Sequence, residues 1–186
     1  MNREQLMQPL LKSFVVFGAA ASLLTGCEST SKEVGWNEQT QIYNTPKVDP
    51  EMLAAQQQSR ATINDFITAL NSGDTANYNF AVKYGFVEGT EREFMWIGQL
   101  SAQGDSLHGV LDNEPDYIHN VQGGQRVVIH KDSIADWNYT RKGRLIGGYS
   151  IRLIRSRMTP AEQAEFDESV SWKLDSKRRL MTQAPF

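Results

Sequence analysis

The chain has 186 residues, 40% of them hydrophobic and 22% charged, which is enough for one globular domain with its own core. Its formal net charge of −3 argues against a nucleic-acid partner, because nucleic-acid-binding domains present a basic face. Cys27 is the single cysteine, so no intramolecular disulfide can form and the core alone must stabilise the fold.

The first 26 residues have the layout of a bacterial export signal. A basic start with Arg3 and Lys12 precedes the apolar stretch 13–24, which is shorter than the roughly 20 apolar residues of a membrane span. The sequence Leu24-Thr25-Gly26-Cys27 then resembles a lipobox, in which the cysteine is acylated and becomes the new N-terminus. We expect a lipoprotein signal peptide at 1–26, with Cys27 as the lipidation site.

Residues 27–48 are expected to be the acylated N-terminus and a flexible tether. The segment 28–48 is polar and has no helical or strand periodicity. Acyl chains at Cys27 would make the membrane a partner of this chain. Glu28, rather than aspartate, follows the cysteine. By resemblance to enterobacterial sorting signals, this residue favours the outer membrane over the inner membrane, with the domain facing the periplasm.

Residues 49–174 are expected to form a single α+β domain, followed by a basic tail at 175–186. A helix is predicted at the start of the domain, because Asp49 can cap it and Pro50 favours the first helical position. Apolar residues at helical spacing follow, and Asn71-Ser72-Gly73 should end this helix.

Strand-like segments with Gly-containing turns follow, which favours an antiparallel meander. In the first strand, apolar residues alternate with small or polar ones such as Lys83, so one face should be buried. In the second, Phe94 and Trp96 share one face while Met95 and Ile97 share the other, so we expect both faces to be buried. The predicted strands span 79–87, 92–100, 107–111 and 126–130.

The C-terminal part contains one ambiguous segment and one clear helix. Residues 144–158 fit either a strand or a helix capped by Ser150, and we prefer the helix. Thr159-Pro160 with Glu162 forms a capping box, which predicts a helix to about residue 168. The expected fold is therefore α+β: an N-terminal helix, a curved antiparallel sheet of about four or five strands that could close into a partial barrel, and a C-terminal helix.

Several segments between residues 51 and 172 resemble a known bacterial family. The most specific ones are Ile134-Ala135-Asp136-Trp137-Asn138-Tyr139 and Gly147-Gly148-Tyr149-Ser150-Ile151-Arg152. Together with Glu93-Phe94-Met95-Trp96, they resemble the domain-of-unknown-function family 2314, including its YegJ-like lipoprotein members. The resemblance implies a small α+β domain without an established activity. Ser150 stands where we expect threonine in the family.

No metal site, cofactor or catalytic residue set is expected. The three histidines are evenly spaced rather than placed as zinc ligands. They are His108, His119 and His130. An acidic loop could bind calcium, but Pro115 interrupts it and the glycine of an EF-hand loop is missing, so we interpret it as an exposed acidic turn. Its acids are Asp112, Glu114 and Asp116.

A candidate interaction surface comprises Asp136, Trp137, Tyr139, Tyr149 and Arg152, which include residue types common at binding hot spots. The alternative is a structural corner, in which Asp136 caps a helix or pairs with Arg152 and Trp137 packs beneath.

The function predicted from these patterns is a non-catalytic binding domain of an uncharacterised envelope lipoprotein, with an envelope protein or glycan as partner. Two alternatives stay open. One is an envelope glycan hydrolase that uses carboxylates such as Asp112 or Asp136. The other is a toxin-neutralising partner domain.

Overall fold

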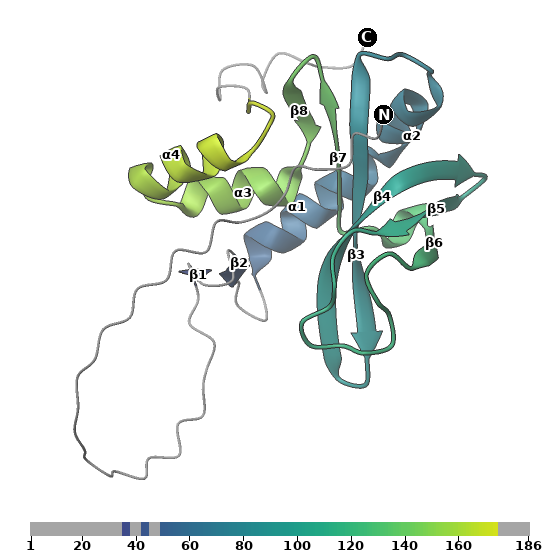
Figure 1. Ribbon diagram of the computed structural model, residues 1–186, viewed down its shortest axis with the longest axis horizontal. Helices are drawn as coiled ribbons and strands as arrows, with labels where there is room; N and C mark the ends of the chain where they lie inside the picture. The colour runs from purple at the N-terminus through teal and green to yellow at the C-terminus, as the bar shows by residue number, and fades with distance from the viewer. Residues whose placement is uncertain (1–34, 38–41, 45–48, 175–186) are drawn as a thin grey trace, which may run out of the picture. The chain divides into compact units, whose positions relative to one another are not determined.

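The computed structural model describes residues 35–37, 42–44 and 49–174 (Figure 1). Strands β1 (Gly35–Asn37) and β2 (Ile42–Asn44) pair with each other in antiparallel orientation. The predicted signal peptide, the predicted lipidation site Cys27 and the predicted basic tail lie outside the described residues. Among the residues that are described, no helix has both the length and the apolar character that crossing a membrane would need.

Two helices open the domain, where the sequence predicted one. Helix α1 spans Pro50–Ala61 and helix α2 spans Ile63–Asn71. Asp49 caps α1 as predicted, because its Oδ1 accepts two backbone N–H groups of the first turn, each at 3.1 Å. The break falls at Thr62, whose hydroxyl donates to the carbonyl of Gln58 at 2.9 Å.

Six antiparallel strands form one sheet in the order β6-β5-β4-β3-β7-β8. The predicted meander is confirmed for β3 to β6, and β7 then returns to pair with the other side of β3. The order has two ends, β6 and β8, so the sheet is open and larger than expected rather than closed into a barrel. The strands are β3 (Asn77–Glu88), β4 (Glu91–Gln103), β5 (Ser106–Leu111), β6 (Arg126–His130), β7 (Asp136–Arg141) and β8 (Arg144–Gly147).

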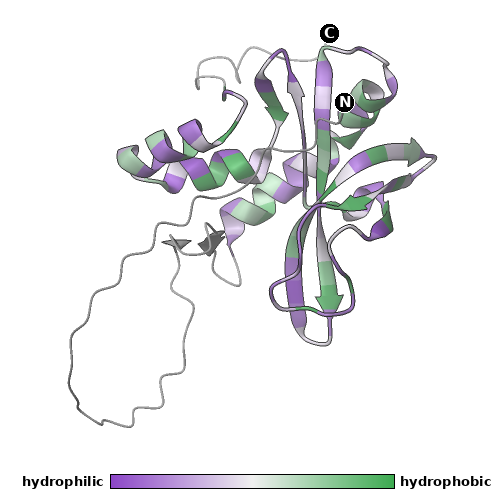
Figure 2. Cartoon of the chain, in the orientation of Figure 1, coloured by the Kyte–Doolittle hydropathy of each residue, from purple (hydrophilic) through white to green (hydrophobic). Residues whose placement is uncertain are grey.

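The hydrophobic core lies between α2 and one face of the sheet, which we call the Val82 face. Val82 on β3 and its cross-strand partner Ile97 on β4 are fully buried there. Phe66 of α2 packs against this face, with its ring centroid 5.7 Å from that of Phe80 and 5.4 Å from that of Trp137. Hydrophobic stretches of β3 and β4 are visible in Figure 2. Burial of this face is the main stabilising contribution to the fold.

The ambiguous segment 144–158 contains both kinds of structure. Its first four residues are strand β8, whereas α3 (Tyr149–Arg157) confirms the preferred helix. The N-cap of α3 is Gly148, not Ser150 as expected, and it has a left-handed φ of 65°. Helix α4 (Pro160–Ser169) starts with the predicted capping box, in which the Glu162 carboxylate accepts the backbone N–H of Thr159 at 2.6 Å.

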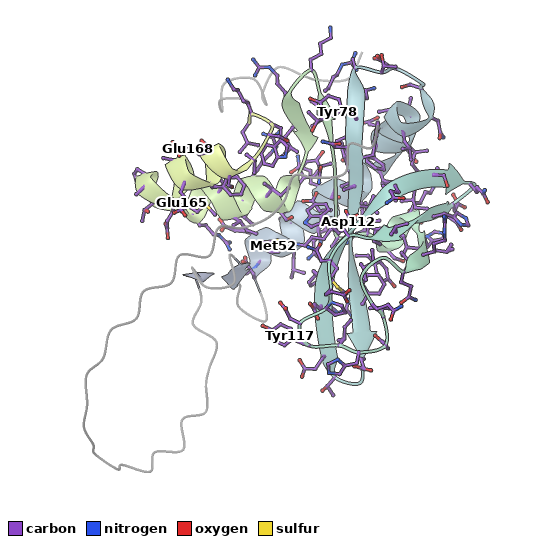
Figure 3. The ribbon with its side chains drawn as sticks, in the orientation of Figure 1. Met52, Tyr78, Asp112, Tyr117, Glu165 and Glu168 are labelled. Carbon is purple, nitrogen blue, oxygen red and sulfur yellow. The ribbon has the colours of Figure 1, made fainter. Side chains whose placement is uncertain are left out.

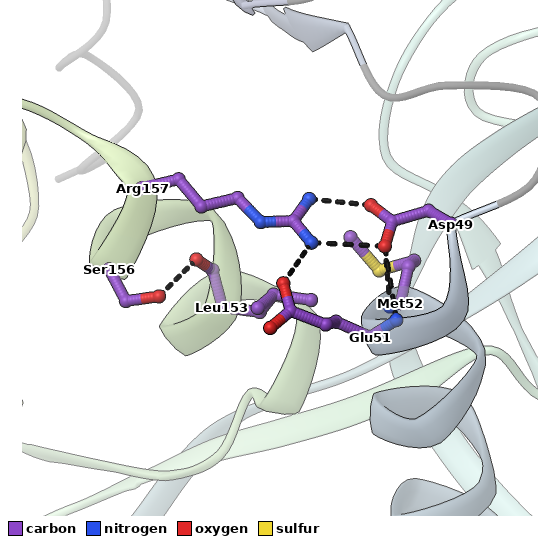
Figure 4. Close-up of polar contacts among 6 residues, drawn as sticks. All are labelled: Asp49, Glu51, Met52, Leu153, Ser156 and Arg157. Carbon is purple, nitrogen blue, oxygen red and sulfur yellow. Dashed lines mark hydrogen bonds and ion pairs between the residues drawn. The ribbon is translucent and has the colours of Figure 1, made fainter.

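Helices α1 and α3 run antiparallel and are joined at one end by an ion-pair cluster (Figure 4). Arg157, the last residue of α3, donates hydrogen bonds to both carboxylate oxygens of Asp49 and to Glu51. The Arg157 guanidinium and the capped backbone N–H groups hold the pKa of Asp49 at about 2. This cluster holds the start of α1 against the end of α3.

Candidate functional site

Two residues of the predicted interaction surface lie in the core. The side chains of Trp137 and Tyr139 point to the Val82 face and are only 3% and 8% exposed. Their rings stack with centroids 6.2 Å apart, and the indole N–H of Trp137 donates to the carbonyl of Ser59 at 2.9 Å. Neither aromatic side chain is available to a partner at the surface.

Asp136 is fully buried at the start of β7 and caps α3 from outside the helix. Its Oδ1 accepts the backbone N–H groups of Trp137 at 2.8 Å and Tyr149 at 3.1 Å. Its Oδ2 accepts the backbone N–H of Ser150 at 2.8 Å and the hydroxyl of that residue at 2.6 Å. Gly148 has no side chain, so this carboxylate takes the place of a normal N-cap residue. Burial raises the pKa of Asp136, although the four hydrogen bonds oppose the shift.

Tyr149 and Arg152 are partly buried at the same corner. The Tyr149 hydroxyl lies 2.8 Å from Thr62 Oγ1, at the junction between α1 and α2. Arg152 donates to the carbonyls of Gly147 at 2.8 Å and Leu145 at 2.7 Å in β8. The predicted interaction surface is therefore wrong for the three buried residues, and the structural corner describes this region better.

The acidic loop after β5 is held by a carboxylate from β4. Glu93 accepts the backbone N–H groups of Asp116, Tyr117 and Ile118 at 2.7, 2.9 and 3.3 Å, and the Ile118 side chain is buried in the core. Tyr117, labelled in Figure 3, is 49% exposed. Within the described residues, no three His, Cys, Asp or Glu side chains are placed to hold a metal ion. The histidines lie apart: His108 on β5, His119 in the loop and His130 at the end of β6.

A row of four residues crosses the opposite face of the sheet, which we call the Lys83 face. Lys83 on β3 is directly opposite Trp96 on β4 and, on its other side, Asp136 on β7. Asp112 follows β5 directly, and its backbone N–H donates to the carbonyl of Trp96 at 3.0 Å. Residues directly opposite each other on neighbouring antiparallel strands lie on the same face, so all four positions share this face.

Two glycines flatten the Lys83 face on either side of Trp96. A Cβ on Gly85 would lie 2.8 Å from Cε1 of Phe94, so the Phe94 ring rests directly on the β3 backbone. A Cβ on Gly98 would lie 2.7 Å from Oδ1 of Asp112, so this carboxylate rests on β4 (Asp112 is labelled in Figure 3). Phe94 is 41% exposed and Trp96 is partly exposed, so the prediction that both faces of 92–100 are buried is wrong.

Lys83 is the most unusual charged group on this face. Its Nζ lies 5.6 Å from the centroid of the Trp96 ring, within the range of a cation–π interaction. Burial lowers the pKa of Lys83, and the negative charge of Asp136 only partly opposes that shift. Among the described residues, no acceptor lies within hydrogen-bond or ion-pair distance of Nζ. A cation withdrawn from water without such a partner costs free energy that a bound anion would offset.

The two carboxylates considered for glycan hydrolysis are not placed as a catalytic pair. Asp112 and Asp136 occupy the ends of the row, three strand spacings from each other. At about 4.8 Å per spacing, their Cα atoms are about 14 Å apart. Asp136 is also fully buried, and its two oxygens accept four hydrogen bonds from protein groups, so it is not free to act with Asp112 on a glycan. Burial raises the pKa of both groups, but this pair does not have the geometry of a hydrolase.

The sequence patterns did not single out Lys83 as a candidate functional residue. The available signal was a lysine in the centre of an otherwise apolar strand, followed along the chain by a strand with aromatic residues at 94 and 96. The register that places Lys83 beside Trp96 and Asp136 is set by pairing between strands, and no local pattern encodes it.

Residues 49–175 match the family described as "Uncharacterized protein conserved in bacteria (DUF2314)", so the chain belongs to this family, as its sequence patterns predicted. The uncharacterized protein YegJ of Escherichia coli strain K12 is 30% identical over 118 residues, which are 63% of this chain and 76% of that protein. A putative ankyrin repeat protein of Neisseria meningitidis serogroup B is 32% identical over 142 residues, 72% of this chain. The matched part is 55% of that relative, so the chain spans about half of its length. No solved structure matches this chain.

Proposed function

We propose that this chain is a bacterial envelope lipoprotein whose domain binds an envelope partner through the Lys83 face and does not catalyse a reaction. The observation that carries the proposal is the Lys83–Trp96 pair: a largely buried cation without an ion-pair partner among the described residues, beside a partly exposed tryptophan. Such a pair is poorly explained by stability, because a buried unpaired charge is destabilising.

The surroundings of this pair also fit a binding surface. Phe94 and Val87 lie on the same face and are 41% and 47% exposed. Val128, opposite His108 at the β6 edge, is 61% exposed. Aromatic residues next to a cation are typical of binding hot spots, where they combine a large apolar contact with one directional charge.

The anchoring part of the proposal rests on the lipobox that ends at Cys27. Acylation there would hold the domain at the membrane, and residues 28–48 would separate it from the lipid headgroups. Glu28 favours the outer membrane. Fractionation of cells that produce wild type or Cys27→Ser, together with labelled palmitate, tests this part. Equal membrane content in the two strains, or no label in the wild type, would contradict it.

The binding part can be tested with a photo-crosslinking amino acid placed at Phe94 in intact cells. The matched control carries the same amino acid at Glu165, an exposed position on α4 (Figure 3). We expect a discrete adduct from position 94 that is absent from position 165 and is lost when Lys83→Met is added. A toxin in that adduct would identify the toxin-neutralising alternative. Adducts that are equal at both positions, or that are insensitive to Lys83→Met, would refute binding at this face.

A further inference from the structure

We propose that the Lys83 face binds a pyranose that carries a carboxylate, as in an acidic sugar unit of an envelope glycan. This inference rests on the proposed function, because it names the ligand of the same face. The four side chains that carry it are Lys83, Phe94, Trp96 and Asp112, which belong to β3, β4 and the residue directly after β5.

Lys83 selects the charge of the ligand. Its ammonium group has three donors, and among the described residues none of them reaches a protein acceptor. The nearby Asp136 cannot serve as that acceptor, because its two oxygens already accept four hydrogen bonds, three from the start of α3 and one from Trp137. A ligand carboxylate would accept a hydrogen bond from Lys83 and neutralise its charge. The surroundings of Lys83 are partly dehydrated, and charge-assisted hydrogen bonds are strong in such an environment.

The aromatic side chains select the shape of the ligand. Trp96 and Phe94 are two residues apart on β4 and project from the same face of the sheet. The Phe94 ring rests on Gly85, which has no side chain, so the surface beside Trp96 is flat. A flat apolar surface of this kind suits the C–H face of a pyranose ring, which packs on aromatic rings through dispersion contacts.

Asp112 provides an acceptor at the far side of Trp96. Asp112 and Lys83 flank Trp96 from the two neighbouring strands, so their Cα atoms are about 10 Å apart. Their side chains can reach opposite ends of one sugar ring between them. One end would place its carboxylate at Lys83, and the other would donate hydroxyl groups to Asp112.

The same charges disfavour two other anions. Lys83 is the cation next to Trp96, because Arg92, which shares this face, lies four residues away along β4. A phosphate dianion or a nucleic-acid backbone at Trp96 would be neutralised only in part by Lys83, and the Asp112 carboxylate would repel it. A single carboxylate with hydroxyl groups on its other side matches one cation and one acceptor. The arrangement therefore points to an acidic sugar rather than to a phosphorylated ligand.

The test is a titration of the ¹⁵N-labelled domain with sodium D-glucuronate, followed by NMR at constant ionic strength. D-glucose is the matched neutral sugar, and sodium acetate is the matched carboxylate without a ring. We expect glucuronate to shift the Trp96 indole N–H and the amide signals of Lys83 and Asp112. Glucose lacks the carboxylate and should bind at least about tenfold more weakly, since a charge-assisted hydrogen bond contributes about 1.5 to 3 kcal/mol. Acetate keeps the carboxylate but lacks the ring that packs on Trp96, so it should also bind at least about tenfold more weakly.

Variants test whether the residues of the Lys83 row bind the glucuronate. Lys83→Met should weaken glucuronate binding at least about tenfold, as expected for loss of a charged hydrogen bond. Lys83→Arg should retain most of it, and the exposed Lys142→Met is the control for loss of one positive charge. The inference is overturned if glucuronate does not bind, if acetate binds equally well, or if Lys83→Met and Lys142→Met behave alike. If any of these results accompanies a specific crosslink at Phe94, the ligand assignment fails while the proposed function stands.

Discussion

The ion pair between Asp49 and Arg157 supports a quantitative prediction about stability. Asp49 accepts two backbone N–H groups at the start of α1 and two hydrogen bonds from Arg157, and its side chain is only 7% exposed. Its pKa falls from 3.8 to about 2 on folding. This shift of nearly two pKa units corresponds to about 2 kcal/mol of stability at neutral pH.

The variant Asp49→Asn keeps an oxygen that can cap α1 but removes the negative charge. We expect it to be about 2 kcal/mol less stable than the wild type at pH 7, measured by urea unfolding with tryptophan fluorescence. A carboxylate whose pKa is lower in the folded state stabilises the fold above its unfolded pKa and loses this effect as pH falls toward 2. The gap between wild type and variant should therefore shrink by about half at pH 3.

The matched control is Asp105→Asn, because Asp105 pairs with Lys131 at an exposed site where its side chain is 65% exposed. This change should cost no more than a few tenths of a kcal/mol, as is usual for surface ion pairs. If Asp49→Asn costs as little as the control at pH 7, or if its effect is the same at pH 3 and pH 7, the charge of Asp49 does not stabilise the fold as described.

Two further predictions concern the Lys83 row. Lys83→Met should raise the free energy of unfolding by about 1 kcal/mol, because a buried unpaired charge is replaced by an apolar side chain of similar length. The pKa of Lys83 is lowered in the folded state, so the stability of the wild type should rise relative to this variant as pH rises toward 10.5. A variant that is less stable than the wild type would contradict the assignment of Lys83 as a buried unpaired charge. Asp136→Ala should cost about 3 kcal/mol, because two backbone N–H groups at the start of α3 and that of Trp137 on β7 lose their acceptor. A loss below about 1 kcal/mol in urea unfolding would show that water replaces it.

Local chemistry was enough to predict the starts of two helices. Asp49-Pro50 and Thr159-Pro160 with Glu162 satisfy the free N–H groups of a helix from residues within one turn, so the signal is contained in the sequence itself. The strands up to β6 were found for a similar reason, because their alternation and turn glycines are local patterns. The family assignment also came from segments that can be read directly.

The cap of α3 could not be predicted in this way. Its N-cap residue, Gly148, has no side chain, and the carboxylate that replaces it belongs to Asp136, in the preceding part of the sheet. The contact exists only because β8 turns back along β7 and brings the two residues together. The same return of the chain buries Trp137 and Tyr139, which a sequence pattern cannot distinguish from surface aromatic residues.

The sequence by itself determined the family, the α+β class, the starts of α1 and α4 and the expectation of a lipid anchor, because each depends on residues close together in the chain. Only the tertiary structure decided which face of the sheet is covered by helices and which residues meet on the other face. Lys83, Trp96, Asp112 and Asp136 come from separate segments, and pairing of strands over long sequence distances puts them in one row. A shift of one residue in that register would move Lys83 into the core, so the candidate site exists only in the folded sheet.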